Sequence, residues 1–401
     1  MKMKILHVFD FFSPVHGGGT VDLLYRVALS QSRRGHEVVI YTSDFELDRD
    51  FINSILGVAV HPFPSWLRIG VTRVTPGIIP AARKNLKDFD IIHLHCFRSF
   101  QNVVIHHYAK KHGIPYILDA HGSTPRLATG NNSPMVFFKW LYDVFFGYQA
   151  MRDADRLIAQ TQVGVDEYSN LGADEEKVTL IHPPIDIDEF KELPKTGTFR
   201  SRYNIGSLKV VMFLGRINWI KGIDFLVKSF AQMASQTQDL LLVIVGPDDG
   251  YQKTVEELIE DLGIGEKVLF TGFLNGEEKL AALVDADILV QPSIYEQAAR
   301  ASLEAMMCNT PVVVSKNTGA GEYIQRMDGG DVVEYGDTDG LIEAIKNTLD
   351  NLAAAQVRTQ KAREYIKANL SVASQTGKYE EVYREVIRNR LKSMKKSNDG
   401  L

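Results

Sequence analysis

Two segments of the chain repeat one pattern, Asp153-Ala154-Asp155-Arg156-Leu157-Ile158 and Asp285-Ala286-Asp287-Ile288-Leu289-Val290. In each segment an Asp-Ala-Asp junction ends a helical pattern and leads into a short apolar run, which is typical of a buried strand. Because the same helix-to-strand junction recurs in both halves of the chain, the sequence predicts two similar domains.

Short apolar runs alternate with amphipathic stretches on both sides of these junctions. The expected strands of the first series are Lys4–Asp10, Glu37–Thr42, Asp90–His95, Pro115–Ala120, Arg156–Thr161 and Lys177–His182. Those of the second series are Lys209–Gly215, Leu240–Gly246, Lys267–Thr271, Asp287–Gln291, Pro311–Ser315 and Asp331–Glu334. A helix is expected over Val21–Arg34, and Gly35 would end it as a C-cap. Such alternation predicts an α/β fold with open parallel sheets.

Prolines and polar residues over 182–197 mark a linker between the two series. We therefore expect an N-terminal domain over 1–182 and a C-terminal domain over 183–375. Residues 376–401 are expected to form a C-terminal helix that packs back toward the N-terminal domain. Ligands of open parallel sheets bind at the carboxyl ends of the strands, so a ligand site is expected in a cleft between the domains.

Composition argues against several classes of protein. The 401 residues include 45 Lys and Arg against 50 Asp and Glu, a net charge of −5, which does not favour nucleic-acid binding. Cys96 and Cys308 stand far apart in the sequence, which argues against a disulfide framework or a Cys-based zinc site and fits a reducing compartment. No apolar run is long enough to span a bilayer. We expect a cytoplasmic protein without a nucleic-acid partner.

A glycine-rich loop follows the first expected strand and reads Ser13-Pro14-Val15-His16-Gly17-Gly18-Gly19-Thr20. Consecutive glycines let the backbone approach a ligand closely, and the N–H groups at the start of the next helix can bind a phosphate. The spacing matches neither the Walker A loop nor G-x-G-x-x-G. Phosphate binding and a simple tight connection are therefore both open for this loop.

Two cations follow the first strand of the second series, within Gly215-Arg216-Ile217-Asn218-Trp219-Ile220-Lys221-Gly222. Arg216 and Lys221 would lie at a helix start, where the helix dipole disfavours cations unless an anionic ligand compensates it. Cations fixed at this place can neutralise a pyrophosphate leaving group. The alternative is that both are surface charges around a helix start.

Two glutamates form the strongest local pattern: Glu296 follows Pro292-Ser293-Ile294-Tyr295, and Glu304 comes eight residues later. This spacing predicts carboxylates about two turns apart on one helix face, with Glu296 at the helix start. Glu304 stands in an apolar stretch, and a buried carboxylate needs a partner. That partner is either a pair of ligand hydroxyls or a group of the protein, such as a backbone N–H.

Together these motifs resemble the family-4 retaining glycosyltransferases of GT-B fold. The resemblance rests on Gly215-Arg216…Lys221-Gly222, Pro292-Ser293…Glu296-x7-Glu304-Ala305, Thr310-Pro311-Val312-Val313, Gly319…Glu322, Gly17–Gly19, Arg34-Gly35-His36-Glu37-Val38 and His182–Asp186. It covers nearly the whole chain. It implies two Rossmann-like open parallel-sheet domains with an interdomain cleft and a C-terminal helical segment. Domain 1–182 would face the acceptor, and domain 183–375 would bind a nucleotide sugar.

The resemblance also implies roles for the charged residues. Arg216 and Lys221 would hold the donor diphosphate. Glu304 would accept hydrogen bonds from the ribose hydroxyls, and Glu296 would lie beside the donor sugar and the reacting centre. A metal is not expected, because Arg216 and Lys221 would already supply the positive charge.

Three residues of the first half are included in the implied site. Gly18 and Gly19 would present backbone N–H groups to the donor phosphate. His121, in Asp119-Ala120-His121-Gly122, corresponds to the family's histidine beside the donor sugar; taken alone, it would be interpreted as a hydrogen-bonded loop histidine. His93 and His95 are interpreted as packed or supporting residues of a strand.

The activity implied is that of a metal-independent, retaining hexosyltransferase. It would move a hexose from a UDP- or GDP-linked sugar to a hydroxyl of a glycan or lipid-linked acceptor, with no cofactor beyond the donor substrate. The acceptor would attack from the side on which the nucleotide leaves. Two alternatives are a catalytically weak sugar-nucleotide-binding subunit and a sugar-nucleotide epimerase or hydrolase on the same fold.

One stretch departs from the family pattern. Where the family usually has a Gly-Phe-Gly-like sequence, this chain reads Gln297-Ala298-Ala299-Arg300. Alanine does not adopt positive φ cheaply, so donor choice and full activity are open. Of the Asp-x-Asp triplets Asp48–Asp50, Asp153–Asp155 and Asp285–Asp287, the last two belong to the repeated junction and are interpreted as structural rather than metal-binding.

Two segments are candidates for the acceptor side. Residues 135–148 are dense in aromatics and predict either a membrane-lying helix that meets a lipid-linked acceptor or a helix packed on the sheet. In the second case Lys139 and Asp143 would form an exposed i,i+4 pair. Trp66-Leu67-Arg68 with Arg73 is the other candidate surface. Peripheral contact with the inner face of a membrane is therefore an open expectation.

Overall fold

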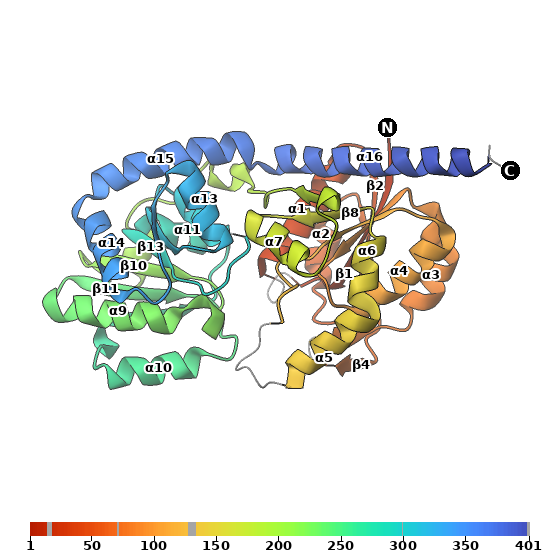
Figure 1. The fold of residues 1–401 in the computed structure, drawn as a ribbon. Coiled ribbons are helices and arrows are strands. Elements are labelled where there is room, and N and C mark those ends of the chain that lie inside the picture. Colours follow the sequence, from red (N-terminus) through yellow and green to blue (C-terminus); the bar gives the residue numbers. More distant parts are fainter. Residues whose placement is uncertain (14–17, 70–71, 127–133, 299, 399–401) are drawn as a thin grey trace. The chain divides into compact units, whose positions relative to one another are not determined.

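The computed structural model describes residues 1–13, 18–69, 72–126, 134–298 and 300–398. Its contacts divide the chain into two units: residues 1–184 with those from 372 onward form unit 1, and residues 185–371 form unit 2. Each unit contains an open sheet of parallel strands with helices on both faces (Figure 1). The predicted fold class, two Rossmann-like parallel-sheet domains with a C-terminal helical segment, is confirmed.

Unit 1 contains a seven-stranded sheet of order β3-β2-β1-β6-β7-β8-β9 in its described residues. Its strands are β1 (Lys4–Phe11), β2 (Glu37–Ser43), β3 (Val58–Phe63), β6 (Ile91–His95), β7 (Tyr116–Asp119), β8 (Arg156–Ala159) and β9 (Val178–Leu180). Its helices are α1 (Gly18–Arg33), α2 (Arg49–Ser54), α3 (Ile78–Asn85), α4 (Phe100–His112), α5 (Pro134–Tyr142), α6 (Tyr148–Asp153), α7 (Gln162–Asn170) and α16 (Val372–Asn398). Short turns of helix span Leu86–Asp88, Asp143–Gly147 and Glu175–Lys177.

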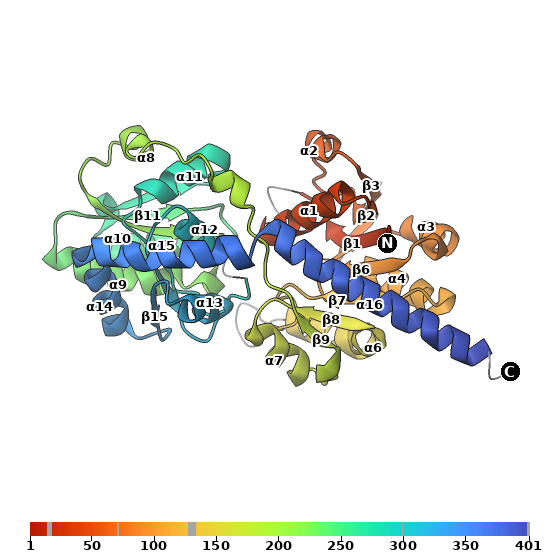
Figure 2. The same cartoon turned by 90° about the horizontal axis from the view of Figure 1, so that it is seen from above.

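Alternation along β1 explains why both faces of this sheet are covered. Successive side chains of a strand point to opposite faces. Leu6 and Val8 pack with residues of α3 and α4, whereas Ile5 packs with residues of α1 and α16. Figure 2 shows α16 running along the same face as α1. Helix α1 ends as predicted: Gly35 has φ +89°, and its N–H donates to the Ser32 carbonyl at 2.9 Å.

Unit 2 contains a six-stranded sheet of order β12-β11-β10-β13-β14-β15 in its described residues. Its strands are β10 (Lys209–Leu214), β11 (Leu240–Val245), β12 (Val268–Gly272), β13 (Ile288–Gln291), β14 (Val312–Ser315) and β15 (Asp331–Val333). Its α-helices are α8 (Thr198–Arg202), α9 (Ile223–Gln236), α10 (Gln252–Asp261), α11 (Gly276–Asp285), α12 (Arg300–Met307), α13 (Gly319–Met327), α14 (Thr338–Asp350) and α15 (Leu352–Asn369). Turns of 3-10 helix span Ile187–Phe190, Trp219–Lys221 and Gly265–Lys267.

The repeated Asp-Ala-Asp junction locks neighbouring strands together. Asp155 accepts a hydrogen bond from the Tyr116 N–H at the start of β7, at 3.0 Å. In unit 2, Asp287 likewise accepts from the Val210 N–H near the start of β10, at 2.7 Å. Asp285 accepts from the N–H groups of Gly197 and Phe199 at 2.6 and 2.7 Å and so fixes the start of α8. These contacts confirm the structural interpretation of both triplets.

Three strands are absent from the sequence prediction. Strand β3 forms the edge of the unit 1 sheet, so half of its residues are exposed and it lacks a continuous apolar run. Pro62 is tolerated there because an edge strand does not need every N–H for pairing. Strands β4 (Leu67–Ile69) and β5 (Thr72–Val74) form a separate antiparallel hairpin. None of the helices in the described part of the chain is long and apolar enough to cross a membrane.

Candidate functional site

The charged residues singled out in unit 2 follow strands at one edge of its sheet. Strand order reverses between β10 and β13, which lie side by side. Ligands of doubly wound sheets bind outside the carboxyl ends of the strands at such a reversal. Arg216 comes two residues after β10 and Glu296 five residues after β13. The topology therefore brings these residues to the edge where a ligand is expected.

Lys221 and Glu296 form an ion pair at this edge. Lys221 closes a short turn of 3-10 helix that Asn218 opens, since the Asn218 side chain accepts from the Ile220 N–H at 3.1 Å. The Lys221 Nζ donates to the Glu296 Oε2, and both side chains are largely buried, at 16% and 12% exposed. The Gln291 amide donates to the same oxygen at 3.1 Å. This carboxylate is thus held from two sides without a ligand.

The predicted placement of Glu296 on the same helix as Glu304 is wrong. Helix α12 begins only at Arg300, and Glu296 lies in the segment that precedes it. The reason is local: the Glu296 carbonyl accepts from the Gly319 N–H at 2.6 Å, and its carboxylate reaches Lys221. The first contact takes the carbonyl oxygen that a helix would use for its own hydrogen bond.

Glu304 lies within α12 and is buried, as expected, but its partners are cations of the protein. Its carboxylate accepts from the Arg300 Nε at 2.8 Å and pairs with the Lys279 Nζ at 2.8 Å. Burial raises the pKa of the Glu304 carboxyl, but the charges of Arg300 and then Lys279 outweigh it and lower the pKa below its ordinary value. A protein partner other than a backbone N–H therefore satisfies this residue.

Arg216 is the most accessible of the four charged residues predicted for the unit 2 site. Its guanidinium pairs with Asp249, which follows β11, and the two side chains are 54% and 39% exposed. An exposed ion pair contributes about 0–1 kcal/mol, so this partner can be exchanged for an anion at little cost. The Asn218 amide also donates to Asp249, at 3.0 Å.

The predicted site residues of unit 1 lie at the carboxyl ends of its strands. Gly18 begins α1 with φ +52°, and Gly19 follows it in the helix, whereas Gly17 lies outside the described residues. His121 comes two residues after β7 and has φ +48°, which is uncommon for a residue with a side chain. Its imidazole contacts the Gln160 and His95 side chains. The roles of these three residues stay predictions.

The aromatic segment is not fully packed against the sheet. Phe137, Phe138 and Phe145 are 57%, 59% and 65% exposed. Lys139 and Asp143 were expected to form an exposed pair, but this prediction is wrong because Asp143 is buried. It accepts from the Arg98 and Arg126 guanidinium groups, each at 2.7 Å.

The second acceptor candidate divides into a buried and an exposed part. Trp66 and Leu67 are 77% and 58% exposed, whereas Arg73 is buried with its guanidinium over the rings of Phe11 and Phe45. The Arg73 Nη1 lies 3.9 Å from the carboxylate of Asp10, near the end of β1.

The partners that hold the charged residues could not be predicted from sequence motifs. Asp249 and Lys279 carry no recognisable motif, because each belongs to a different loop or helix from the residue it contacts. Gln291 had a usable signal: a polar residue at the carboxyl end of an otherwise apolar strand faces the ligand edge. Ala299, part of the departing stretch, lies outside the described residues.

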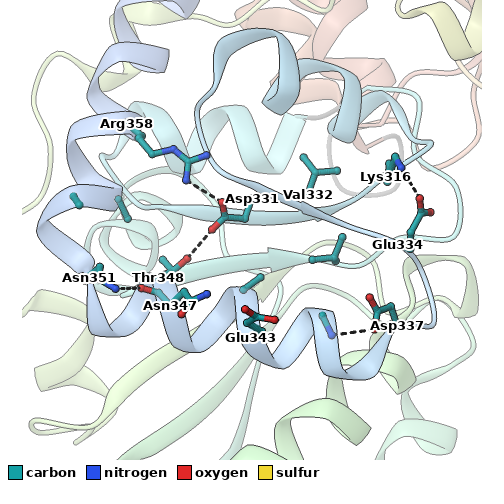
Figure 3. A pocket seen from close by; sticks show the side chains of 15 residues that line it. Lys316, Asp331, Val332, Glu334, Asp337, Glu343, Asn347, Thr348, Asn351 and Arg358 are labelled. Atoms are coloured by element: carbon teal, nitrogen blue, oxygen red, sulfur yellow. Dashed lines mark hydrogen bonds and ion pairs between the residues drawn. The ribbon is translucent and has the colours of Figure 1, made fainter.

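A cavity of about 620 Å³ lies elsewhere in unit 2, along edge strand β15 and helices α14 and α15 (Figure 3). Four of its charged groups form two ion pairs: Asp331 accepts from Arg358 at 2.9 Å, and Lys316 contacts Glu334 at 2.7 Å. Asp337 caps α14 by accepting from the Gly340 N–H at 2.9 Å. Its polar residues thus serve the fold.

The two halves of the chain match two family models. Residues 17–189 match the model described as Glycosyltransferase Family 4, and residues 197–366 match that of Glycosyl transferases group 1. An uncharacterised glycosyltransferase of Methanocaldococcus jannaschii is 27% identical over 345 residues, which are 82% of this chain and 84% of that protein. The D-inositol 3-phosphate glycosyltransferase of Corynebacterium diphtheriae is 24% identical over 417 residues, covering 96% and 95% of the two chains.

Two solved structures share the fold. HepE of Anabaena in complex with UDP-glucose has a TM-score of 0.78 at 20% identity and covers 96% of this chain and 100% of its own. Sucrose-phosphate synthase from Thermosynechococcus elongatus has a TM-score of 0.79 at 17% identity and covers 97% and 100%. At such low identity these similarities concern the architecture alone.

Proposed function

Because the chain belongs to the family-4 glycosyltransferases of GT-B fold and therefore uses a nucleotide sugar, we propose that it is a retaining hexosyltransferase. It would move a hexose from a UDP- or GDP-linked sugar to a hydroxyl of a glycan or lipid-linked acceptor. The observation that carries the proposal is the group of charges that follow β10 and β13: Arg216, Lys221, Glu296 and Glu304.

A diphosphate fits the cations of this group. The Arg216 guanidinium is half-exposed and pairs with the exposed Asp249, so an incoming diphosphate competes with a weak partner. Lys221 is held in place by its turn and by Glu296, so its ammonium is already oriented when the donor arrives. Two oriented cations stabilise the charge that develops on a leaving nucleoside diphosphate. The proposed reaction therefore needs no metal ion.

The carboxylates would bind the sugar parts of the donor. Glu304 uses one oxygen for Arg300 and the other for Lys279, but each carboxylate oxygen can accept more than one hydrogen bond. A ribose hydroxyl can thus be added without breaking either ion pair. We assign the donor hexose to Glu296, whose carboxylate is fixed by Lys221 and Gln291. The front-face reaction, in which the donor phosphate assists the acceptor hydroxyl, remains part of the proposal.

For the acceptor we propose the carboxyl end of β1 in unit 1. The Asp10 Oδ1 and both polar atoms of the Gln101 side chain are buried without a hydrogen-bond partner among the described residues. Gln101 lies beside Asp10 and lowers the pKa of its carboxyl, so the two side chains form one polar group at the end of β1. Buried polar groups in this state need a partner, and acceptor hydroxyls would supply one.

Membrane contact is a further part of the proposal, since a lipid-linked acceptor would require it. The exposed Phe137, Phe138 and Phe145 support it, because aromatic residues on a surface helix favour the membrane interface. Flotation with anionic lipid vesicles would test it, and loss of binding in a Phe138→Ser variant is the expected result.

Metal-free thermal unfolding with a panel of nucleotides and nucleotide sugars tests the donor site. A ligand at 100 times its dissociation constant adds about 2.7 kcal/mol of stability, which gives a clear shift in Tm. We expect one UDP- or GDP-linked sugar to stabilise the protein and Glu304→Gln to lose that shift. Glu304→Gln also lowers stability without ligand, because it leaves Lys279 and Arg300 without their anion.

The ligand-induced shift, rather than the Tm itself, is therefore the readout. Asp331→Asn is the matched control, because it breaks an ion pair with Arg358 at the start of β15, the strand end opposite to the ligand edge, and should leave the shift unchanged. An equal shift in Glu304→Gln and the wild-type protein would contradict the assigned site. Release of free hexose from the donor without an acceptor would favour the hydrolase alternative.

A further inference from the structure

Unit 1 contains a cluster of buried histidines that the proposed function does not use. His7, His93 and His95 each offer one ring nitrogen, and these three nitrogens lie within 4.8 Å of one another. All three rings are fully buried between β1, β6 and the helices α1 and α16. His95 in turn contacts His121, the histidine proposed to lie beside the donor sugar.

Four hydrogen bonds join part of this cluster into one chain, which we call the histidine relay: Gln160, His121, His95, His7 and Gln31. The Gln160 Nε2 lies 2.7 Å from the His121 Nδ1, and the His121 Nε2 lies 2.7 Å from the His95 Nδ1. The His95 Nε2 lies 2.9 Å from the His7 Nδ1. The His7 Nε2 lies 2.8 Å from the Gln31 Oε1.

All three imidazoles of the relay are neutral near pH 7. Burial lowers the pKa of His7 to about 4 and holds that of His95 well below 6.5. Burial also lowers the pKa of His121, although the charge of Asp119 opposes this. A neutral imidazole has one N–H donor and one acceptor nitrogen. If one nitrogen of a ring donates, the other must accept, so all hydrogen bonds of the relay run in the same direction.

The side-chain amides of Gln31 and Gln160, at the two ends of the relay, are compatible with one and the same direction. The Gln31 Oε1 can only accept, so the donor is the His7 Nε2–H, and by the same step the donors of His95 and His121 are their Nε2–H groups. The His121 Nδ1 then accepts from the Gln160 Nε2 at 2.7 Å, the shorter of its two contacts. The Asp119 Oδ1 lies 3.2 Å from the same nitrogen, and an Nδ1–H bonded to Asp119 is the competing form that the NMR experiment distinguishes. This orientation of Gln160 fits its surroundings: burial raises the pKa of Asp119, and hydrogen bonding from Gln160 opposes that rise.

We propose that Gln31, His7 and His95 are positioning residues, which hold His121 in its Nε2–H form and thereby fix the backbone bend after β7. His121 has φ +48°, and a residue with a side chain stays in that conformation only when its surroundings hold it there. The ring is held through both nitrogens, and the backbone N–H donates to Asp119 at 3.1 Å. The functional value of this bend rests on the proposed function.

Helix α16 supports the relay at both ends. The Tyr379 hydroxyl donates to Asp119 at 3.2 Å. At the other end the Gln31 amide donates to the Tyr383 hydroxyl at 3.4 Å, and that hydroxyl lies 2.7 Å from the His93 Nδ1. Gln31 is thus the residue where the relay meets the C-terminal helix.

A metal ion is the competing explanation for the cluster. The His93 Nε2 has no hydrogen-bond partner among the described residues, and three imidazoles are a common zinc ligand set. The facing nitrogens of His7 and His95 are 2.9 Å apart, a hydrogen-bond distance. Two nitrogens bound to one tetrahedral zinc would be about 3.3 Å apart. The observed spacing favours the relay, and metal content enters its test.

NMR of the full-length protein with ring-¹⁵N-labelled histidine, at pH 7 and without ligand, tests the relay directly. We expect the Nε2–H pattern for His7, His95 and His121. In His7→Leu, His95 loses its acceptor, so His95 and His121 should both change to mixed tautomers. Gln31→Met breaks the chain one residue further away and should give the same change if His7→Leu does not fold.

Two further variants separate positioning from packing. His7→Gln should restore the wild-type pattern at His121, because an amide can accept from His95 and donate to Gln31. His36→Gln is the matched control: His36 is also buried in unit 1, but its Nδ1 accepts from the Met3 N–H and it lies outside the relay. It should leave the His121 signals unchanged.

Turnover gives the functional readout. The rate of sugar transfer by His7→Leu should fall about tenfold, which is the effect of losing one hydrogen bond that supports His121. The rate should recover in His7→Gln. An unchanged His121 tautomer in His7→Leu and Gln31→Met, or one equivalent of zinc in the purified protein, would overturn the relay. If the wild-type protein turns over no nucleotide sugar, the proposed function fails, whereas the tautomer measurement still decides the relay.

Discussion

Glu304 illustrates how the charged residues of this chain are stabilised before any ligand binds. It is almost fully buried, yet Arg300 and Lys279 keep its carboxylate ionised. Lys221 and Glu296 neutralise each other in the same way. A donor would therefore enter a set of charges that are already paired and oriented, which lowers the reorganisation needed on binding.

The burial of the Asp10 carboxylate is only partly compensated by its neighbours. Burial raises its pKa from 3.8 to about 6, although the charge of Arg73 opposes this. Because the folded protein binds this proton more tightly than the unfolded chain, the stabilisation is complete below pH 4 and is lost as the pH rises through 6. The difference between the pKa values of Asp10 in the folded and unfolded states corresponds to about 3 kcal/mol of stability. Asp10→Asn should therefore be more stable than the wild-type protein at pH 7.

Urea unfolding of both proteins between pH 4 and pH 7.5 measures this effect. The free energy of unfolding of the wild-type protein should fall relative to Asp10→Asn over this range. Asp88→Asn, which replaces an exposed aspartate of the same unit, should run parallel to the wild-type protein. Parallel curves for Asp10→Asn as well would show that the Asp10 carboxylate is solvated.

At the residue scale, the sequence predicted which side chains matter but not what holds them. Arg216, Lys221, Glu296 and Glu304 stand in a recognisable spacing. Their partners come from distant segments, as Asp249 and Lys279 do, and such pairings depend on the tertiary fold. The histidine relay could not be predicted for the same reason: Gln31 and His121 belong to separate elements and share no motif.

Among the elements, buried parallel strands were predictable and exposed or irregular segments were not. Every expected strand is present, and most of them are buried on both faces and read as continuous apolar runs. Edge strand β3 lacks such a run. The segment that carries Glu296 is shaped by contacts with Lys221 and Gly319, which helical spacing cannot reveal.

The turn that presents Lys221 depends on Gly222. Gly222 has φ +65°, and an added Cβ would lie 2.0 Å from the Pro292 carbonyl oxygen. Gly250 also has positive φ, but a Cβ there meets nothing within 4 Å. Gly250→Ala should therefore cost only the conformational penalty of about 1–2 kcal/mol, whereas Gly222→Ala should cost several.

Thermal unfolding of the two variants compares these costs, and donor binding shows whether Lys221 has moved. We expect Gly222→Ala to lose the ligand-induced Tm shift and Gly250→Ala to keep it. Equal destabilisation by both substitutions would mean that the backbone at Gly222 can move away from Pro292.

For the whole molecule, the repeated junction correctly indicated two related domains. The sequence also predicted a C-terminal helix over 376–401 that packs back toward the N-terminal domain. Unit 1 takes its last helix, α16, from beyond unit 2. Five apolar side chains of that helix are buried in unit 1: Tyr379, Val382, Tyr383, Val386 and Ile387.

Removing α16 should therefore unfold unit 1 selectively. Each buried apolar side chain contributes about 1.5–3 kcal/mol, so the five together match the whole stability of a typical domain, about 5–15 kcal/mol. A variant that ends at Ser371 should lose one calorimetric transition and retain that of unit 2. A variant that ends at Leu391 keeps all five residues and should show both transitions. Two transitions in the shorter variant would contradict this role of α16.

The discontinuity of unit 1 also matters while the protein is being made. Residues 1–184 leave the ribosome long before residues 372–398, which must still cover them. The intervening residues 185–371 take about ten to forty seconds to translate at about 5–20 residues per second. During that interval unit 2 can fold on its own, whereas the sheet face around Ile5 and Ile91 stays uncovered by α16. The newly made first half is thus the part of this protein that most needs a chaperone.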